Sequence, residues 1–210
     1  MTEDEGSAPA DLAGNLAFAK ALVSDGGRAQ ATGGAAFLAA GLCYGLQCLL
    51  QWAQIRGWLY NGALFPLVLG VGPSVVFVII LGLILWRGGG VQPQGVATRA
   101  LNASYGSAGL ANLFMVFVFG YNALTQKSLA IWLYYPCVVC AFQGAVWYVA
   151  YMIRRRLWLA VVSGGWFAVT VALGLTLRDV PTYVLVLGFA LTFLMGGSGW
   201  YMMRQAKTKA

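Results

Sequence analysis

The chain has 210 residues and a formal net charge of +7, with 60% hydrophobic residues, only 9% charged residues and no histidine. A soluble domain carries about 25% charged residues because its surface faces water, so this composition excludes an ordinary soluble domain and favours a surface that faces lipid. The basic residues lie in short gaps between apolar runs, which is typical of membrane proteins and not of a nucleic-acid-binding face. We therefore expect no nucleic-acid partner.

Residues 1–31 are expected to form a cytoplasmic N-terminal segment with one short amphipathic helix. The helix is predicted to begin near Asp11, and its apolar residues fall on one helical face, at Leu12, Leu16, Ala19 and Val23. Gly26 and Gly27 are expected to end it. The first residues are acidic and lack the basic start of a secretory signal, so no cleavable signal is predicted.

Six apolar runs follow, and each is long enough to cross a bilayer core of about 30 Å, which needs about 20 helical residues. They are predicted at 32–54, 59–86, 98–123, 128–153, 157–177 and 181–203. The second run contains Pro66 and Pro73, so a kink or tilt is expected there. Short connections should make consecutive helices antiparallel neighbours. The sequence thus predicts an all-α polytopic membrane protein, with one six-transmembrane-helix bundle over 32–204 and a cytoplasmic tail at 205–210.

The basic residues are distributed unequally between the two sides of this bundle. Ten of the 13 Lys and Arg residues lie on the side that holds both termini, and the other side holds Arg56, Lys127 and Arg178. Basic residues favour the cytoplasmic side. We therefore predict a multi-pass protein of a bacterial-type cytoplasmic (inner) membrane, with both termini in the cytoplasm.

The predicted spans hold no Asp, Glu, Lys or Arg away from their ends. Ionisable groups inside a membrane usually mark ion-coupled transport or proton relays, so these functions and intramembrane carboxylate catalysis are disfavoured. The lack of histidine removes the commonest metal ligand and the usual axial ligand of haem. We expect no enzyme activity, no cofactor and no metal site.

Four cysteines lie inside predicted spans. Cys43 and Cys48 are on the first, and Cys137 and Cys140 form a CxxC pair on the fourth. By depth, Cys43 could pair with Cys140 or Cys48 with Cys137, so a disulfide or redox role is one interpretation. The favoured interpretation is that these cysteines pack as small apolar residues.

Polar residues in the spans form a second set of candidates. On the first helix, Tyr44, Gln47 and Gln51 share one face, and later spans contain Asn112, Gln143 and Trp147. Amides in hydrocarbon need hydrogen-bond partners. The favoured interpretation is bonding between helices, and the alternative is a ligand cavity lined by these six residues.

Two further patterns concern packing and the membrane surface. Gly41 and Gly45 form a GxxxG motif, which predicts a close approach of another helix. Arg154, Arg155 and Arg156 form the strongest charge cluster. Fixing the topology is its expected role, and binding of an anionic lipid headgroup is the functional alternative.

Two function classes follow from these patterns. The favoured class is a non-enzymatic, structural or regulatory membrane module that binds lipid, a membrane-protein partner or a second copy of itself. The alternative is a small transporter or channel for a neutral or zwitterionic solute, which requires a cavity containing Gln47 or Gln143. Thiol redox activity is the more distant third class.

Overall fold

The computed structural model describes residues 8–59, 62, 64–87 and 95–208, with side chains from Gln30 onward. The described chain is helical throughout, apart from short turns and connections. Its elements are α1 (Ala8–Ile55), α2 (Phe65–Arg87), α3 (Val96–Thr125), α4 (Leu129–Arg154), α5 (Leu157–Thr176), α6 (Val180–Ala190), a π-helical segment η1 (Leu191–Gly196) and α7 (Gly197–Lys207).

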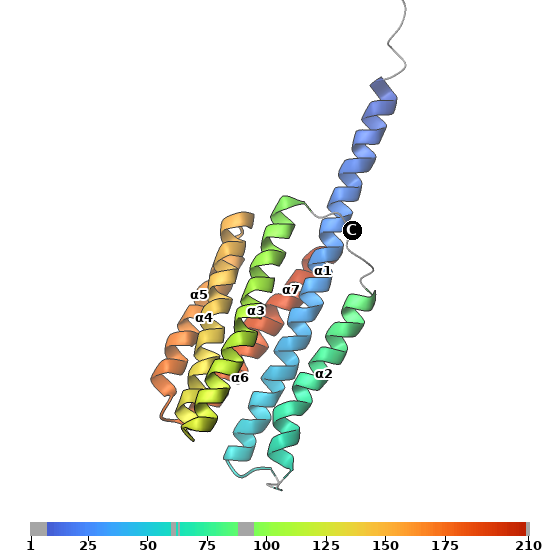
Figure 1. The fold of residues 1–210 in the computed structure, drawn as a ribbon. Helices are drawn as coiled ribbons and strands as arrows, with labels where there is room; N and C mark the ends of the chain where they lie inside the picture. The colour runs from blue at the N-terminus through green and yellow to red at the C-terminus, as the bar shows by residue number, and fades with distance from the viewer. Residues whose placement is uncertain (1–7, 60–61, 63, 88–94, 209–210) are drawn as a thin grey trace, which may run out of the picture.

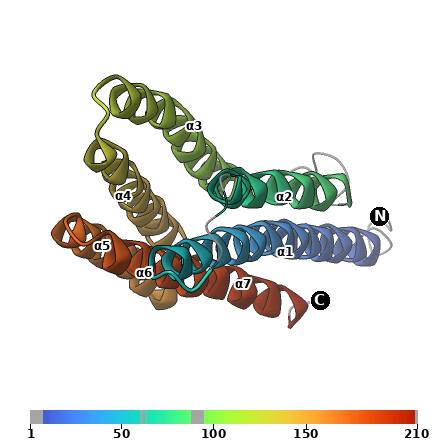
Figure 2. The same cartoon turned by 90° about the horizontal axis from the view of Figure 1, so that it is seen from below.

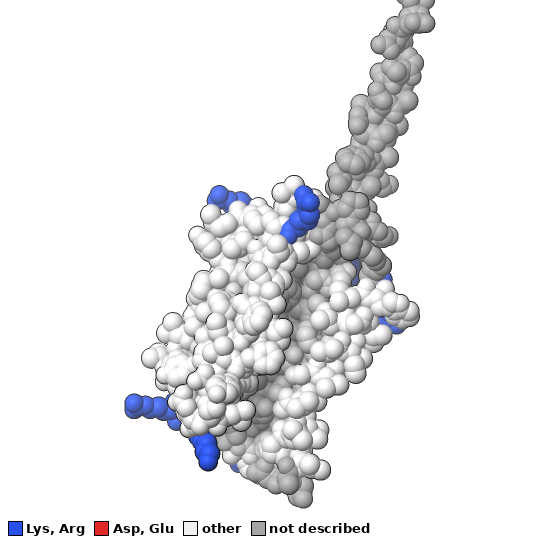
Figure 3. All heavy atoms as spheres, viewed as in Figure 1, with Lys and Arg blue, Asp and Glu red and all other residues white. Residues whose placement is uncertain are grey.

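Six of these stretches are long and apolar enough to cross a membrane, which confirms the predicted six-helix architecture. They comprise the part of α1 from Gln30 to Ile55, the four helices α2 to α5, and the continuous stretch from Val180 to Lys207 that joins α6, η1 and α7. The face drawn in Figure 3 shows basic side chains only at its two ends, with uncharged residues between them. This distribution matches a bilayer around the middle of the bundle.

The predicted short N-terminal helix is not a separate element. α1 runs without interruption through Gly26 and Gly27 into the first span, and its N-terminal part projects beyond the other helices (Figure 1). Each glycine costs a helix only about 1 kcal/mol relative to alanine. The flanking sequence is rich in alanine and has no proline between Pro9 and Pro66, so nothing stronger interrupts the helix.

The second span begins six residues later than predicted. α2 starts at Phe65 and not at residue 59, which places Pro66 in the first helical turn. A proline there loses no intrahelical hydrogen bond, whereas a helix beginning at residue 59 would hold Pro66 in its interior. Pro73 does lie inside α2.

Two groups of packed elements organise the bundle, as Figure 2 shows from below. α4 packs along α5 and α3, while α1 packs along α2 and along the α6–η1–α7 stretch. α5 and α6 join the two groups. Within the described chain, α2 packs to any large extent only on α1, and α3 only on α4. These two helices therefore stand at the outside of the bundle without covering each other.

The tightest packing lies between α1 and the last span. A Cβ atom added to Gly41 would stand 2.6 Å from the Cα of Gly196, and one added to Gly34 would stand 2.8 Å from the carbonyl oxygen of Gly199. Gly45 faces Thr192 of η1 in the same way. The close approach predicted from the GxxxG motif is confirmed, and its partner is the stretch containing the π-helical turn.

Candidate functional site

A cavity of about 70 Å³ lies at the end of the bundle where α4 finishes and α5 begins. We call this end, which carries Arg87, Arg99, Arg154, Arg155, Arg156, Arg204 and Lys207, the basic end. Five elements supply the lining, namely α1, α3, α4, α5 and α7. The lining residues used below are Gln30, Phe37, Tyr105, Trp147, Arg154 and Trp158.

Aromatic rings form the walls of this cavity. The ring centroid of Phe37 on α1 lies 5.2 Å from that of Tyr105 on α3 and 5.4 Å from that of Trp147 on α4. Trp158 on α5 adds a T-shaped contact to Trp147 at 5.8 Å. Edge-to-face contacts of this kind fix ring positions, so the walls are rigid and come from four different helices.

Three nitrogen donors of the lining have no partner among the described residues. The indole N–H groups of Trp147 and Trp158 are buried and have no described hydrogen-bond acceptor. Arg154 lines the cavity, and no hydrogen bond or ion pair links it to a described residue. Buried donors are normally satisfied, so these three groups leave hydrogen-bond donors of the lining unused.

A clamp of hydrogen bonds closes the neighbouring part of the basic end. Gln30 donates through Nε2 to the carbonyl oxygen of Met202 and to Oε1 of Gln205, both at 3.3 Å. Arg156 donates through Nη1 to the same Gln205 oxygen at 2.6 Å. These bonds tie α1, the start of α5 and α7 together, which holds the cavity in shape.

The three consecutive arginines are thus placed in three different environments. Arg154 lines the cavity, Arg155 is exposed in a left-handed conformation with φ of 51°, and Arg156 is engaged by Gln205. The lipid-headgroup role predicted for the whole cluster stays a prediction. The structure brings only Arg154 to the cavity.

The predicted polar stripe on α1 faces α2. Gln47 donates through Nε2 to the carbonyl oxygen of Gly70 at 3.2 Å, and the ring of Tyr44 packs on Phe77 at 5.4 Å. Gln51 is partly buried one helical turn further along. Of the six predicted cavity residues, only Trp147 lines the cavity described here.

Asn112 and Gln143 are the remaining two candidates. The side-chain oxygens Oδ1 of Asn112 and Oε1 of Gln143 are buried and have no hydrogen-bond partner. The antiparallel register of α3 and α4, in which Tyr105 meets Trp147 and Phe119 meets Tyr135, places both amides at one level of the bundle. Both predicted interpretations therefore keep support, because Gln47 bonds between helices whereas these two amides are unsatisfied.

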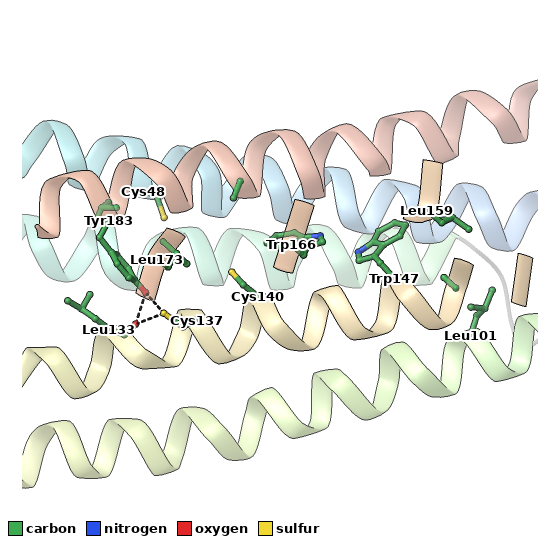
Figure 4. Close-up of a cluster of buried hydrophobic side chains, with 13 residues drawn as sticks. Cys48, Leu101, Leu133, Cys137, Cys140, Trp147, Leu159, Trp166, Leu173 and Tyr183 are labelled. Carbon is green, nitrogen blue, oxygen red and sulfur yellow. Dashed lines mark hydrogen bonds between the residues drawn. The ribbon is translucent and has the colours of Figure 1, made fainter. Parts of the chain in front are cut away.

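All four cysteines are free in the structure, and three are buried in the core. Cys137 lies 3.8 Å from the hydroxyl of Tyr183, which donates to the carbonyl oxygen of Leu133 at 2.6 Å (Figure 4). Cys140 is almost completely buried. These positions fit apolar packing, and the predicted disulfide or redox role stays a prediction.

Two carbonyls that accept side-chain hydrogen bonds share a local cause. Gly70 stands three residues before Pro73 in α2, and Leu133 stands three residues before Pro136 in α4. A proline inside a helix cannot bond to the carbonyl four residues before it, which is that of Leu69 for Pro73 and of Trp132 for Pro136, and its ring displaces the preceding turn. The carbonyls that Gln47 and Tyr183 engage lie one residue further on, in that displaced turn.

Several cavity residues were not singled out by sequence reasoning. Phe37, Trp158 and Gln30 carry no motif, and Trp158 resembles an ordinary interfacial tryptophan. One signal was present, because Trp147, Ala150 and Arg154 share one face of α4 at spacings of three and four residues. This face of α4, which runs from Trp147 to Arg154, forms one wall of the cavity.

Comparison with protein-family models, with curated proteins and with solved structures gives no match to this chain.

Proposed function

We propose that this chain is a non-enzymatic membrane module that binds a lipid of the surrounding bilayer. The observation that carries the proposal is the incomplete packing of the outer helices. α2 packs on α1 and α3 packs on α4, and the surface is recessed between α2 and α3 (Figure 3). The backbone groups of both helices are already hydrogen-bonded within each helix. An acyl chain can therefore lie in the recess between them without leaving any backbone group unpaired.

The chemistry of the two outer helices supports the same proposal. Apolar side chains such as Phe114 and Phe117 on α3 and Val75 and Ile79 on α2 are exposed. The spans contain no charged residue away from their ends. Such surfaces suit acyl chains and do not supply the ionisable groups that ion-coupled transport and acid–base catalysis use.

Retention of lipid during purification tests the proposal. The full-length protein, extracted in a mild detergent, is examined by native mass spectrometry. The proposal predicts adducts of phospholipid mass that survive detergent exchange. A spectrum containing only the lipid-free chain, under conditions in which the helical fold persists by circular dichroism, contradicts it.

The second candidate function is a small transporter for a neutral or zwitterionic solute. Its support is the pair of unsatisfied amide oxygens on Asn112 and Gln143, which could bond a solute. Cys140 stands one helical turn before Gln143 and is nearly inaccessible. A transporter must admit water to this level, so a small water-soluble thiol reagent should modify Cys140 in membranes; a lipid-binding module leaves it unmodified.

We further propose that the membrane is a cytoplasmic membrane and that the basic end faces the cytoplasm. Seven basic residues of the described chain lie at the basic end, against Arg56, Lys127 and Arg178 at the opposite end. This asymmetry agrees with the positive-inside rule. In this proposed orientation, the cavity lies at the depth of the inner-leaflet headgroups.

A further inference from the structure

We propose that the cavity at the basic end binds the phosphate group of an anionic phospholipid. This inference rests on the proposed lipid-binding function and assigns to it a headgroup class and a site. Its three supports are the charge of the lining, the unpaired donors and the size of the cavity.

The charge of the lining favours an anion. Arg154 is the only charged residue among those that line the cavity, and no described acid accompanies it. Arg99 stands beside the lining residue Thr98. A guanidinium without a carboxylate partner in a partly desolvated site attracts phosphate oxygens strongly.

The unpaired donors favour a ligand that brings acceptors. The indole N–H of Trp158 is buried without a partner, and Arg154 contributes a guanidinium that no described residue engages. Trp147 contributes its ring to the wall, while Figure 4 draws its indole nitrogen on the side toward Trp166. Phosphate oxygens accept several hydrogen bonds, so a phosphate bound by Arg154 has acceptors left for a further donor such as Trp158.

The aromatic walls raise a competing ligand, a quaternary ammonium held by cation–π contacts. Phe37, Tyr105 and Trp147 already contact one another, with Tyr105 edge to face against the other two rings and Phe37 tilted against Trp147. The positive charge of Arg154 in the same cavity opposes a second cation, and no lining acid offsets it. The lining therefore favours a net anionic headgroup over a choline headgroup.

Size and position favour a lipid over a larger soluble ligand. The cavity of about 70 Å³ is far smaller than the ~300–1,000 Å³ pockets that enclose drug-sized ligands. It has room for a phosphate and not for a nucleotide. It lies at the end of the spans, where Arg154 is the last residue of α4. A lipid whose phosphate occupies this position can keep its acyl chains in the bilayer.

The structure separates Arg154 from its neighbours, which gives a matched control. Arg155 is exposed at the same end and carries the same charge. Arg156 belongs to the clamp through Gln205 and is left unchanged. Comparing Arg154→Gln with Arg155→Gln therefore isolates the cavity from the general positive potential of this surface.

The test measures which phospholipid the full-length protein retains from nanodiscs that contain phosphatidylglycerol and phosphatidylcholine. Native mass spectrometry should show selective retention of phosphatidylglycerol by the wild type. Arg154→Gln should lower that retention by about tenfold, as loss of a charge-assisted hydrogen bond predicts, and Arg155→Gln by less than about twofold, as expected for an exposed charge. Trp158→Phe, which keeps the ring and removes the N–H, should lower it by about threefold.

Three results would overturn the inference. They are equal retention by Arg154→Gln and the wild type, preference for phosphatidylcholine, and displacement of phosphatidylglycerol by millimolar inorganic phosphate, which would identify a soluble anion as the ligand. Arg154→Lys guards against a folding defect, because it keeps the charge and should keep the selectivity. If lipid is retained without headgroup selectivity, only this inference fails; if the wild type retains no phospholipid, the proposed function fails as well.

Discussion

At the scale of single residues, the bundle is held by side chains that bond to backbone carbonyls near prolines. Gln47 bonds to Gly70 ahead of Pro73, and Tyr183 bonds to Leu133 ahead of Pro136. Hydrogen bonds between membrane helices contribute on average about 0.6 kcal/mol and at most about 1.7 kcal/mol. Tyr183 is fully buried and its bond is short, so its contribution should lie in the upper part of that range.

The substitution Tyr183→Phe tests this value. It removes the hydroxyl, keeps the ring and leaves the carbonyl of Leu133 with only the weak thiol donor of Cys137, at 3.6 Å. We expect the free energy of unfolding to fall by about 1 kcal/mol, measured by titration with a denaturing detergent. Tyr121→Phe, at a largely exposed site on α3, is the control and should be neutral, and equal effects of the two substitutions would contradict the assigned role.

Sequence reasoning recovers part of this residue-level chemistry. It predicts that the amide stripe on α1 bonds between helices, and one of these amides, Gln47, forms such a bond. It does not identify Tyr183, because a tyrosine near the start of a span fits the interfacial belt equally well. It also groups Arg154 with Arg155 and Arg156, since the turn that separates their environments depends on the left-handed backbone at Arg155.

At the scale of elements, close packing between α1 and the last span contrasts with the open face of α3. Gly41 has no room for a Cβ atom, because one would stand 2.8 Å from the carbonyl oxygen of Leu191. Gly109 on α3 has no neighbouring atom within 4 Å of the same position. The number of glycines in a helix does not show which of them pack closely against another helix. In the structure, the close approach is that of α1 to η1, at Gly41.

The contrast predicts opposite effects of one substitution at two sites. Gly41→Ala should destabilise the bundle by about 1–3 kcal/mol, because the extra methyl group forces the helices apart. Gly109→Ala should be neutral or stabilising by up to about 1 kcal/mol, because alanine is the better helix former. Thermal unfolding of both variants in one detergent checks this, and equal destabilisation would show that α3 packs against a further surface.

The element boundaries show where sequence patterns suffice and where they do not. Apolar run length locates all six spans because the bilayer thickness fixes it. The start of α2 is misplaced because hydropathy does not register that Pro66 is tolerated only in a first turn. Gly26 and Gly27 are predicted to end the first helix, whereas α1 continues through both. The low helix propensity of glycine is too small an effect to end a long helix by itself.

At the scale of the whole molecule, the orientation of the bundle decides which leaflet the cavity at the basic end faces. The substitutions Gln126→Cys and Thr208→Cys, each in a variant whose native cysteines are replaced by serine, place a thiol at opposite ends of the bundle. A membrane-impermeant maleimide added to intact cells should label Gln126→Cys and spare Thr208→Cys. The reverse pattern would place the basic end and its cavity on the outer side.

The central claim is that lipid occupies the recess between α2 and α3. Photo-crosslinking in a bilayer tests it most directly, with a phospholipid that carries a diazirine in its acyl chain. We predict that crosslinked peptides from α2 and α3 outnumber those from the exposed face of α5, which carries Val161, Val171 and Leu175. Uniform labelling of all lipid-facing helices would contradict a specific lipid site.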